Sequence, residues 1–115
     1  ERWVNGIEVL PGARQVVHHI LVFVVPKGRN QAIGEQLEGI NGFFGIYVPG
    51  NSALMYADGF AKRIPANSDL RFQIHYTPNG TATTDQSRIG LRFAKEAPKH
   101  EVKTAGVANL LINIP

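Results

Sequence analysis

The residues of this sequence best suited to chemistry are its four histidines, His18, His19, His75 and His100. His18 and His19 are adjacent within the apolar run VVHHILVFVV at residues 16–25. Leaving an imidazole without partners inside an apolar strand costs roughly 1–3 kcal/mol. Two adjacent imidazoles therefore indicate a partner that both can contact. A metal ion is such a partner, because neutral imidazole is the commonest protein ligand of zinc and copper.

Strand geometry is an obstacle to a ligand shared by His18 and His19. In a regular β-strand, neighbouring side chains point to opposite faces of the sheet. A β-bulge or local twist would bring both rings to one side. The two nitrogens of each ring also reach in different directions. We therefore expect the backbone at His18–His19 to depart from regular strand geometry, or the rings to approach differently, so that both reach the side where His75 points.

The strand that carries His75 is predicted at residues 69–76, where apolar and polar residues alternate. One face carries Leu70, Phe72, Ile74 and Tyr76, and the other carries Arg71, Gln73 and His75. Tyr76 is interpreted as a packing residue, and His75 lies on the polar face. Three imidazoles can hold Zn²⁺ with an open fourth position, or copper. The residue types alone leave both metals open, together with a purely structural role for each histidine, which is the interpretation for His100.

The elements that must position these histidines are mostly strands. Strands are predicted at residues 3–10, 15–25, 69–76, 87–94 and 107–114, with a short strand or extended loop at 42–50. Turns are predicted at residues 11–14 and 77–80, and the PKGRN segment at 26–30 ends the strand before it. One or two helical turns are predicted at 31–38, a loop at 51–59, and a segment leading into a turn at 60–68. The strand at 15–25 is apolar on both faces, so we expect both to be covered. The pattern predicts an all-β fold, an antiparallel β-sandwich or jelly roll.

Composition limits the classes of function. The 115 residues fit one domain, and 43% hydrophobic with 18% charged residues is typical of a folded globular protein. A net charge of +3 from scattered basic residues, with no basic stripe, argues against nucleic-acid binding. The absence of cysteine excludes disulfides and thiolate metal sites. No apolar run reaches the ~18 residues of a membrane-spanning helix.

Two stretches of the sequence carry a family resemblance. PGARQVVHHILVFV, followed by DGFAKRIPANSDLRFQIHYTPNGTATTDQSRIGLRFA, resembles the N-terminal copper domain of the type II, ascorbate-dependent copper monooxygenases. This family includes peptidylglycine α-hydroxylating monooxygenase and dopamine β-monooxygenase, and the likeness is greatest to its bacterial members. The resemblance covers roughly residues 8–95, and its most specific parts are the HHIL and QIHY segments.

The resemblance implies a fold, a metal and a reaction. Family members have two similar jelly-roll domains, each holding one copper, on either side of a solvent-filled cleft. The copper of the first domain is held by an adjacent His-His pair and one later His, which correspond here to His18, His19 and His75. It receives an electron from ascorbate and passes it to the second domain, whose copper activates O₂ and hydroxylates a C–H bond. The resemblance also implies an extracytoplasmic location, periplasmic or secreted.

The sequence departs from the family where the second copper is concerned. That copper is held by an H-x-H pair and a Met, but no H-x-H occurs here and the one methionine, Met55, falls in the predicted 51–59 loop. We therefore expect residues 1–115 to be a single copper-binding domain without catalytic residues of its own, part of a longer chain with a second copper domain after residue 115. Gln73 is predicted to hydrogen-bond a ligand ring.

Two alternatives stay open at this point. The first is a copper-binding module that uses the same histidines but has no catalytic role. The second is a metal-free structural or interaction domain. In that case the His75 ring would lie well over ~10 Å from the His-His pair, because metal–nitrogen bonds are about 2 Å long.

Overall fold

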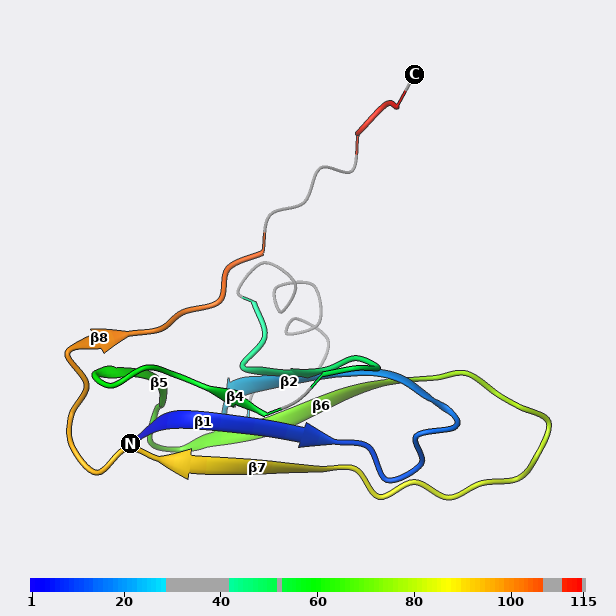
Figure 1. Ribbon diagram of the computed structural model, residues 1–115, viewed down its shortest axis with the longest axis horizontal. Coiled ribbons are helices and arrows are strands. Elements are labelled where there is room, and N and C mark those ends of the chain that lie inside the picture. Colours follow the sequence, from blue (N-terminus) through cyan, green and yellow to red (C-terminus); the bar gives the residue numbers. More distant parts are fainter. Residues whose placement is uncertain (29–41, 52, 107–110, 115) are drawn as a thin grey trace.

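The computed structural model describes residues 1–28, 42–51, 53–106 and 111–114. These residues form an all-β structure, as predicted, in two mostly antiparallel sheets (Figure 1). Its strands are β1 (Arg2–Leu10), β2 (Val17–Pro26), β3 (Gly45–Tyr47), β4 (Leu54–Met55), β5 (Phe60–Ile64), β6 (Ser68–Tyr76), β7 (Arg88–Phe93) and β8 (His100–Glu101). The helical turns predicted at 31–38 lie outside the described residues.

The first sheet is built around β1. β7 pairs with most of its length, and the short strands β4 and β5 pair with separate parts of it. These pairings are antiparallel, whereas β8 pairs with β5 in parallel. The second sheet has the order β3-β2-β6. Its long antiparallel ladder runs from Val17 opposite Tyr76 to Pro26 opposite Ser68, so β2 and β6 form one extended surface.

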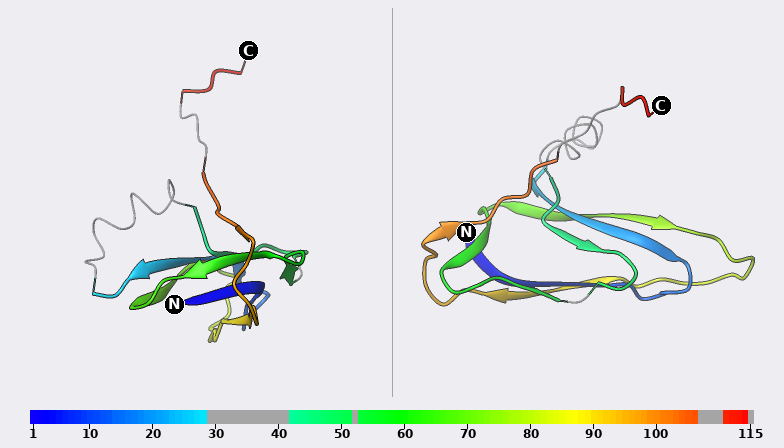
Figure 2. Two further views of the ribbon diagram at one scale, coloured as in Figure 1. Left: turned by 90° about the vertical axis from the view of Figure 1, so that its left-hand side faces the viewer. Right: turned by 45° about the horizontal axis from the view of Figure 1, so that its top comes forward.

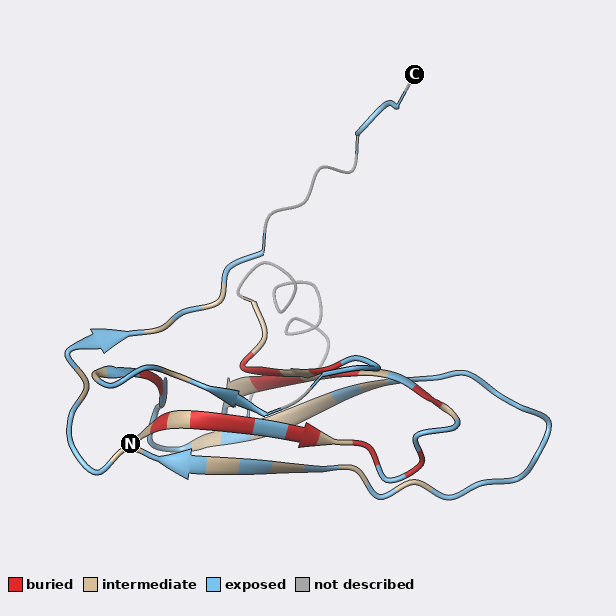
Figure 3. Ribbon diagram, viewed as in Figure 1, coloured by how far each residue is buried: buried red, intermediate tan, exposed pale blue. Residues whose placement is uncertain are grey.

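The two sheets face each other across a shared core, which is consistent with a β-sandwich. Figure 2 shows β2 and β6 in one layer and β1 and β7 in the other. Buried residues from both layers form one cluster, namely Val4, Ile7, Val9, Val17, Ile20, Val22, Phe44 and Tyr47. Burial is concentrated in β1 and β2 (Figure 3). Phe23, whose position in β2 alternates with Ile20 and Val22, is also buried, so β2 is partly covered on both faces, as expected.

A final strand is predicted at residues 107–114, and the structure corrects this prediction over the part that it describes, residues 111–114. Residues 111–114 form no strand and lie apart from both sheets in Figure 1, and residues 107–110 lie outside the described ones. The side chains of Leu111, Ile112 and Ile114 are 91%, 68% and 81% exposed. Apolar composition produces a strand only where the segment pairs with a sheet edge and buries a face, and residues 111–114 belong to neither described sheet.

Lys62 in β5 is a buried charged residue, 6% exposed, that joins three parts of the chain. Its Nζ donates hydrogen bonds to the carbonyl oxygens of Phe43 and Phe44, at 3.2 and 2.9 Å, and to the Thr104 hydroxyl at 2.6 Å. Three acceptors match the three N–H groups of an ammonium. Burial lowers the pKa of Lys62. The amine thus links the segment before β3 and the segment after β8 to β5.

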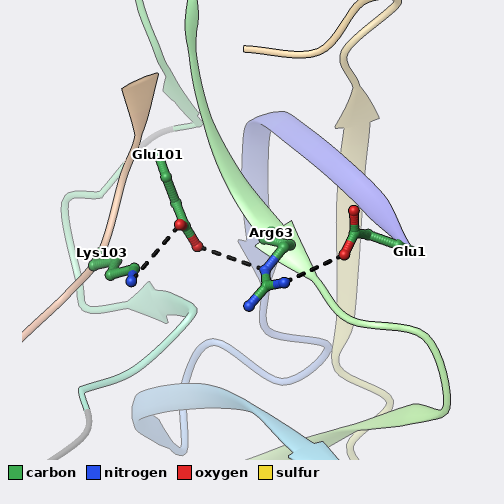
Figure 4. Close-up of polar contacts among 4 residues, drawn as sticks. All are labelled: Glu1, Arg63, Glu101 and Lys103. Atoms are coloured by element: carbon green, nitrogen blue, oxygen red, sulfur yellow. Dashed lines mark hydrogen bonds and ion pairs between the residues drawn. The ribbon is translucent and has the colours of Figure 1, made fainter. Parts of the chain in front are cut away.

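Three ion pairs between described residues connect the same region at the surface (Figure 4). Arg63 lies 3.3 Å from the Glu1 carboxylate and 3.7 Å from that of Glu101, which is also 3.6 Å from Lys103 Nζ. These side chains remain solvent-exposed, so each pair contributes only about 0–1 kcal/mol. The buried amine of Lys62 is therefore the stronger connection.

We predict that replacing Lys62 by alanine lowers the free energy of unfolding by about 1–3 kcal/mol, because the buried carbonyl of Phe44 and the partly buried carbonyl of Phe43 lose their donor. Urea denaturation followed by Trp3 fluorescence measures the change. Lys103→Ala is the matched control and should cost less than about 1 kcal/mol, since its ion pair is exposed. Equal losses in the two variants would contradict the role assigned to Lys62.

Candidate metal centre

The adjacent histidines lie at an irregularity in the pairing of β2 with β6. Val17 is opposite Tyr76 and His19 is opposite His75, so one step along β6 corresponds to two steps along β2. His18 is therefore the additional residue of a β-bulge. The expected departure from regular strand geometry is present at His18–His19.

Burial shows what the bulge does to the alternation of side chains. Val17 and Ile20 are both buried in the core between the sheets, at 3% and 0% exposure. Residues three apart in a regular strand point to opposite faces. The additional residue allows both to face inward, and it leaves two consecutive side chains, His18 and His19, on the outer face. His75, opposite His19, shares that face.

The three imidazole rings come together on this outer face. Their centroids are 5.3 Å apart for His18 and His19, 4.9 Å for His18 and His75, and 5.0 Å for His19 and His75. The rings of His18 and His75 are exposed, and His19 is half-buried. The Nδ1 atoms of His18 and His19 are 3.1 Å apart, so one donates a hydrogen bond to the other, in a direction set by the tautomers.

The donor set fits zinc or copper. One ring nitrogen from each histidine can be chosen so that all three lie within 4.8 Å of one another. Nitrogens bound at about 2.0 Å to one ion are separated by about 3.3 Å at tetrahedral angles and by at most about 4 Å. Small ring rotations would close that difference. Three nitrogen donors without a carboxylate do not suit Ca²⁺ or Mg²⁺, which prefer oxygen.

The electrostatics of the cluster favour the neutral form of the His19 ring. Desolvation lowers the pKa of His19, and the neighbouring His75 and His18 lower it further. A neutral imidazole carries a lone pair on one nitrogen, which is the form that binds a metal. The surroundings of His19 therefore favour the protonation state that binds a metal.

The other residues named in the sequence analysis lie outside the three-ring cluster. Gln73 is exposed in β6, two residues before His75 and opposite Leu21, but among the described residues it forms no hydrogen bond with the three rings. The hydrogen bond from Gln73 to a ligand ring stays a prediction. His100 is outside the cluster, in β8, where its ring stacks on Phe60 at a centroid distance of 4.7 Å. Met55 is in β4 of the other sheet, opposite Gly6.

The structure corrects the interpretation of Tyr76 as a packing residue. Its side chain is 45% exposed at the end of β6, and its hydroxyl donates a 2.7 Å hydrogen bond to Asp85. The alternation in residues 69–76 gives the correct face, but the sheet ends there and leaves the ring uncovered. Asp85 carries no signal in the sequence, because a lone aspartate between two predicted strands belongs to no periodic pattern.

We predict that the His19 ring of the metal-free protein titrates with a pKa below the ordinary value of 6.5. In the His75→Ala variant the pKa of His19 should move back toward 6.5, because the electrostatic influence of the His75 ring is removed. A pH titration of the His Cε1–H NMR signals measures both. Since the unfolded chain binds this proton more readily, the protein should lose stability as the pH falls through 6.5. A His19 pKa at or above 6.5 would contradict the electrostatics described.

Comparison of the chain with protein-family models, with curated proteins and with solved structures finds no match in any of the three. Among the described residues there is also no helix with the length and apolar character needed to cross a membrane. The assignment of the centre therefore depends on the arrangement of its three rings, and the resemblance to copper monooxygenases stays a prediction.

Proposed function

We propose that this chain is the copper-binding, electron-transfer domain of an ascorbate-dependent copper monooxygenase, which hydroxylates C–H bonds with O₂. The observation that carries the proposal is the convergence of the His18, His19 and His75 rings, whose centroids are 4.9–5.3 Å apart, on the outer face of one sheet. These are the residues that the sequence resemblance assigns to copper.

Copper is favoured over zinc by the resemblance to the ascorbate-dependent family. Imidazole suits both metals, and the two cannot be separated by ligand count. Copper when bound supplies one-electron redox chemistry, which an ascorbate-dependent enzyme requires. Three neutral nitrogen ligands without a thiolate suit a site that must hold both Cu(I) and Cu(II) with modest rearrangement.

The chain contributes rigid positioning and access. His19 and His75 are opposite residues of the β2–β6 ladder, so backbone hydrogen bonds fix the distance between the two strands that carry them. The exposed rings of His18 and His75 leave the centre open to a small reductant such as ascorbate. Desolvation and the other two rings favour the neutral state of His19.

The proposed enzyme is larger than the residues described. It includes a second copper domain of the same polypeptide, because this sequence has no H-x-H and its Met55 lies in the other sheet. It also includes the jelly-roll topology of the family and an extracytoplasmic location. The two-sheet arrangement with a shared core supports the topology at a coarser level.

A non-catalytic copper-binding module is the alternative that a specific observation favours, namely the lack of an H-x-H motif in the chain. The sequence that follows Pro115 distinguishes the two, since a second domain with H-x-H and a later Met supports the enzyme. The metal-free alternative has less support, because it requires a ring separation well over ~10 Å, whereas the His75 ring centroid is 4.9 and 5.0 Å from those of the pair.

We predict that the protein binds one copper per chain and that His75→Ala abolishes stable binding, because two adjacent rings alone leave one ligand position unfilled. Elemental analysis after copper loading and desalting measures the ratio. His100→Ala is the matched control, since His100 stacks on Phe60 in the other sheet, and it should retain one copper. Copper at background in the wild-type protein, or undiminished in His75→Ala, would refute the proposal.

We predict that ascorbate reduces the copper-loaded protein. The Cu(II) signal in electron paramagnetic resonance should disappear on anaerobic addition of ascorbate, and it should return on addition of a one-electron oxidant, with the copper still bound. Copper that stays oxidised under excess ascorbate would contradict an electron-transfer role while leaving metal binding intact.

A further inference from the structure

A carboxylate joins the two strand ends that carry the histidines. Asp85 is half-buried in the connection between β6 and β7. Its Oδ1 accepts a 2.8 Å hydrogen bond from the backbone N–H of Ala13. Its Oδ2 accepts hydrogen bonds from the Tyr76 hydroxyl at 2.7 Å and the Ser87 hydroxyl at 2.8 Å. One side chain therefore connects the turn before β2, the end of β6 and the start of β7.

On the β2 side the contact leads directly to the bulge. Ala13 is buried, and its carbonyl oxygen accepts hydrogen bonds from the N–H groups of Val16 and Val17, both at 3.1 Å. Val17 is the last regularly paired residue before His18. The position of Ala13 therefore sets where the chain enters the bulge.

On the β6 side the contact reaches the residue after His75. Tyr76 donates to Asp85, and the following residue, Thr77, donates its N–H to the carbonyl of Val16 at 2.7 Å. These hydrogen bonds form a closed circuit that links Asp85, Ala13, Val16, Thr77 and Tyr76. The bulge and His75 lie next to this circuit, on the two strands that it joins.

Gly12 shows how closely these segments approach. A Cβ atom added at Gly12 would lie 2.6 Å from the backbone nitrogen of Gln86 and 2.7 Å from Asp85 Oδ1. The turn before β2 is therefore in direct contact with residues 85–86, with no space for a side chain between them. The network is a packed connection and not a chance surface contact.

We propose that Asp85 is a positioning residue of the three-histidine centre, which holds the segment before His18 against the residue after His75. This inference rests on the proposed function, because it concerns the same centre. A bulge residue lacks regular ladder hydrogen bonds, so its geometry depends on what fixes its flanks. Desolvation raises the pKa of Asp85, but hydrogen bonds from Tyr76, Ser87, Ala13 and Gly12 outweigh it and lower the pKa, which keeps the carboxylate an acceptor at neutral pH.

The test compares Asp85→Asn with Asp69→Asn. The asparagine at 85 keeps one acceptor for Ala13, but its amide nitrogen cannot accept from Tyr76 or Ser87. Asp69 is an exposed aspartate at the opposite end of β6, paired with Val25, and provides the same chemical change away from the centre. Competition titration should show Cu(II) affinity reduced about 10-fold or more in Asp85→Asn, with an altered Cu(II) hyperfine splitting, and both unchanged in Asp69→Asn.

A second measurement needs no metal. In the metal-free protein, NMR cross-relaxation between ring protons of His19 and His75 reports their proximity, since the ring centroids are 5.0 Å apart. These cross-peaks should weaken or disappear in Asp85→Asn and persist in Asp69→Asn. If the wild-type protein binds no copper, the proposed function fails, and the cross-peaks still decide whether Asp85 positions the rings.

Tyr76→Phe is a milder second variant that keeps the test valid if Asp85→Asn does not fold. It removes only the hydroxyl that donates to Asp85 and should change the affinity and the cross-peaks in the same direction, by less. If Asp85→Asn and Tyr76→Phe lower the melting temperature but leave the hyperfine splitting, affinity and ring cross-peaks as in the wild type, Asp85 is a structural residue only and the inference is wrong.

Discussion

Neighbouring side chains of a β-strand point to opposite faces, and the bulge at His18 interrupts this alternation. Without the additional residue, the pairing that buries Ile20 would turn one imidazole of the pair toward the apolar core. Burying it there without a partner costs roughly 1–3 kcal/mol. With the bulge, the core receives Val17 and Ile20, and both imidazoles face His75. The geometry of the centre therefore follows from the requirement that an apolar strand keep its core face apolar.

The rest of the fold holds the bulged strand and its histidines in place. The β2–β6 ladder gives the histidines a rigid base, and the β1 sheet covers its inner face. Loops are then held to the sheets by single charged groups. Lys62 connects the segments near Phe44 and Thr104, and Asp85 connects the turn before β2 to the end of β6. Each such group has several hydrogen-bond partners, which is what makes a partly or fully buried charge compatible with stability.

The histidine cluster and its strands could be predicted because their signals are local. Residue type and alternation in 69–76 place His75 on the outer face, and the adjacent His18 and His19 in an apolar strand pose a geometric problem with few solutions. β5 was missed because its buried positions are held by Ala61 and Lys62, which give no apolar alternation. Its partner β8 has only two residues, too few for any periodic pattern. Tyr76 and the final segment were misinterpreted because the ends of sheets depend on tertiary contacts that alternation does not encode.

The central claim is that His18, His19 and His75 together hold one copper ion. X-ray absorption spectroscopy at the copper edge tests it most directly, because it counts imidazole ligands through their ring scattering. The account predicts three nitrogen ligands at about 2.0 Å, all from imidazole, and no sulfur. Fewer than three imidazoles per copper, or a sulfur ligand, for which Met55 is the one methionine of the chain, would contradict it.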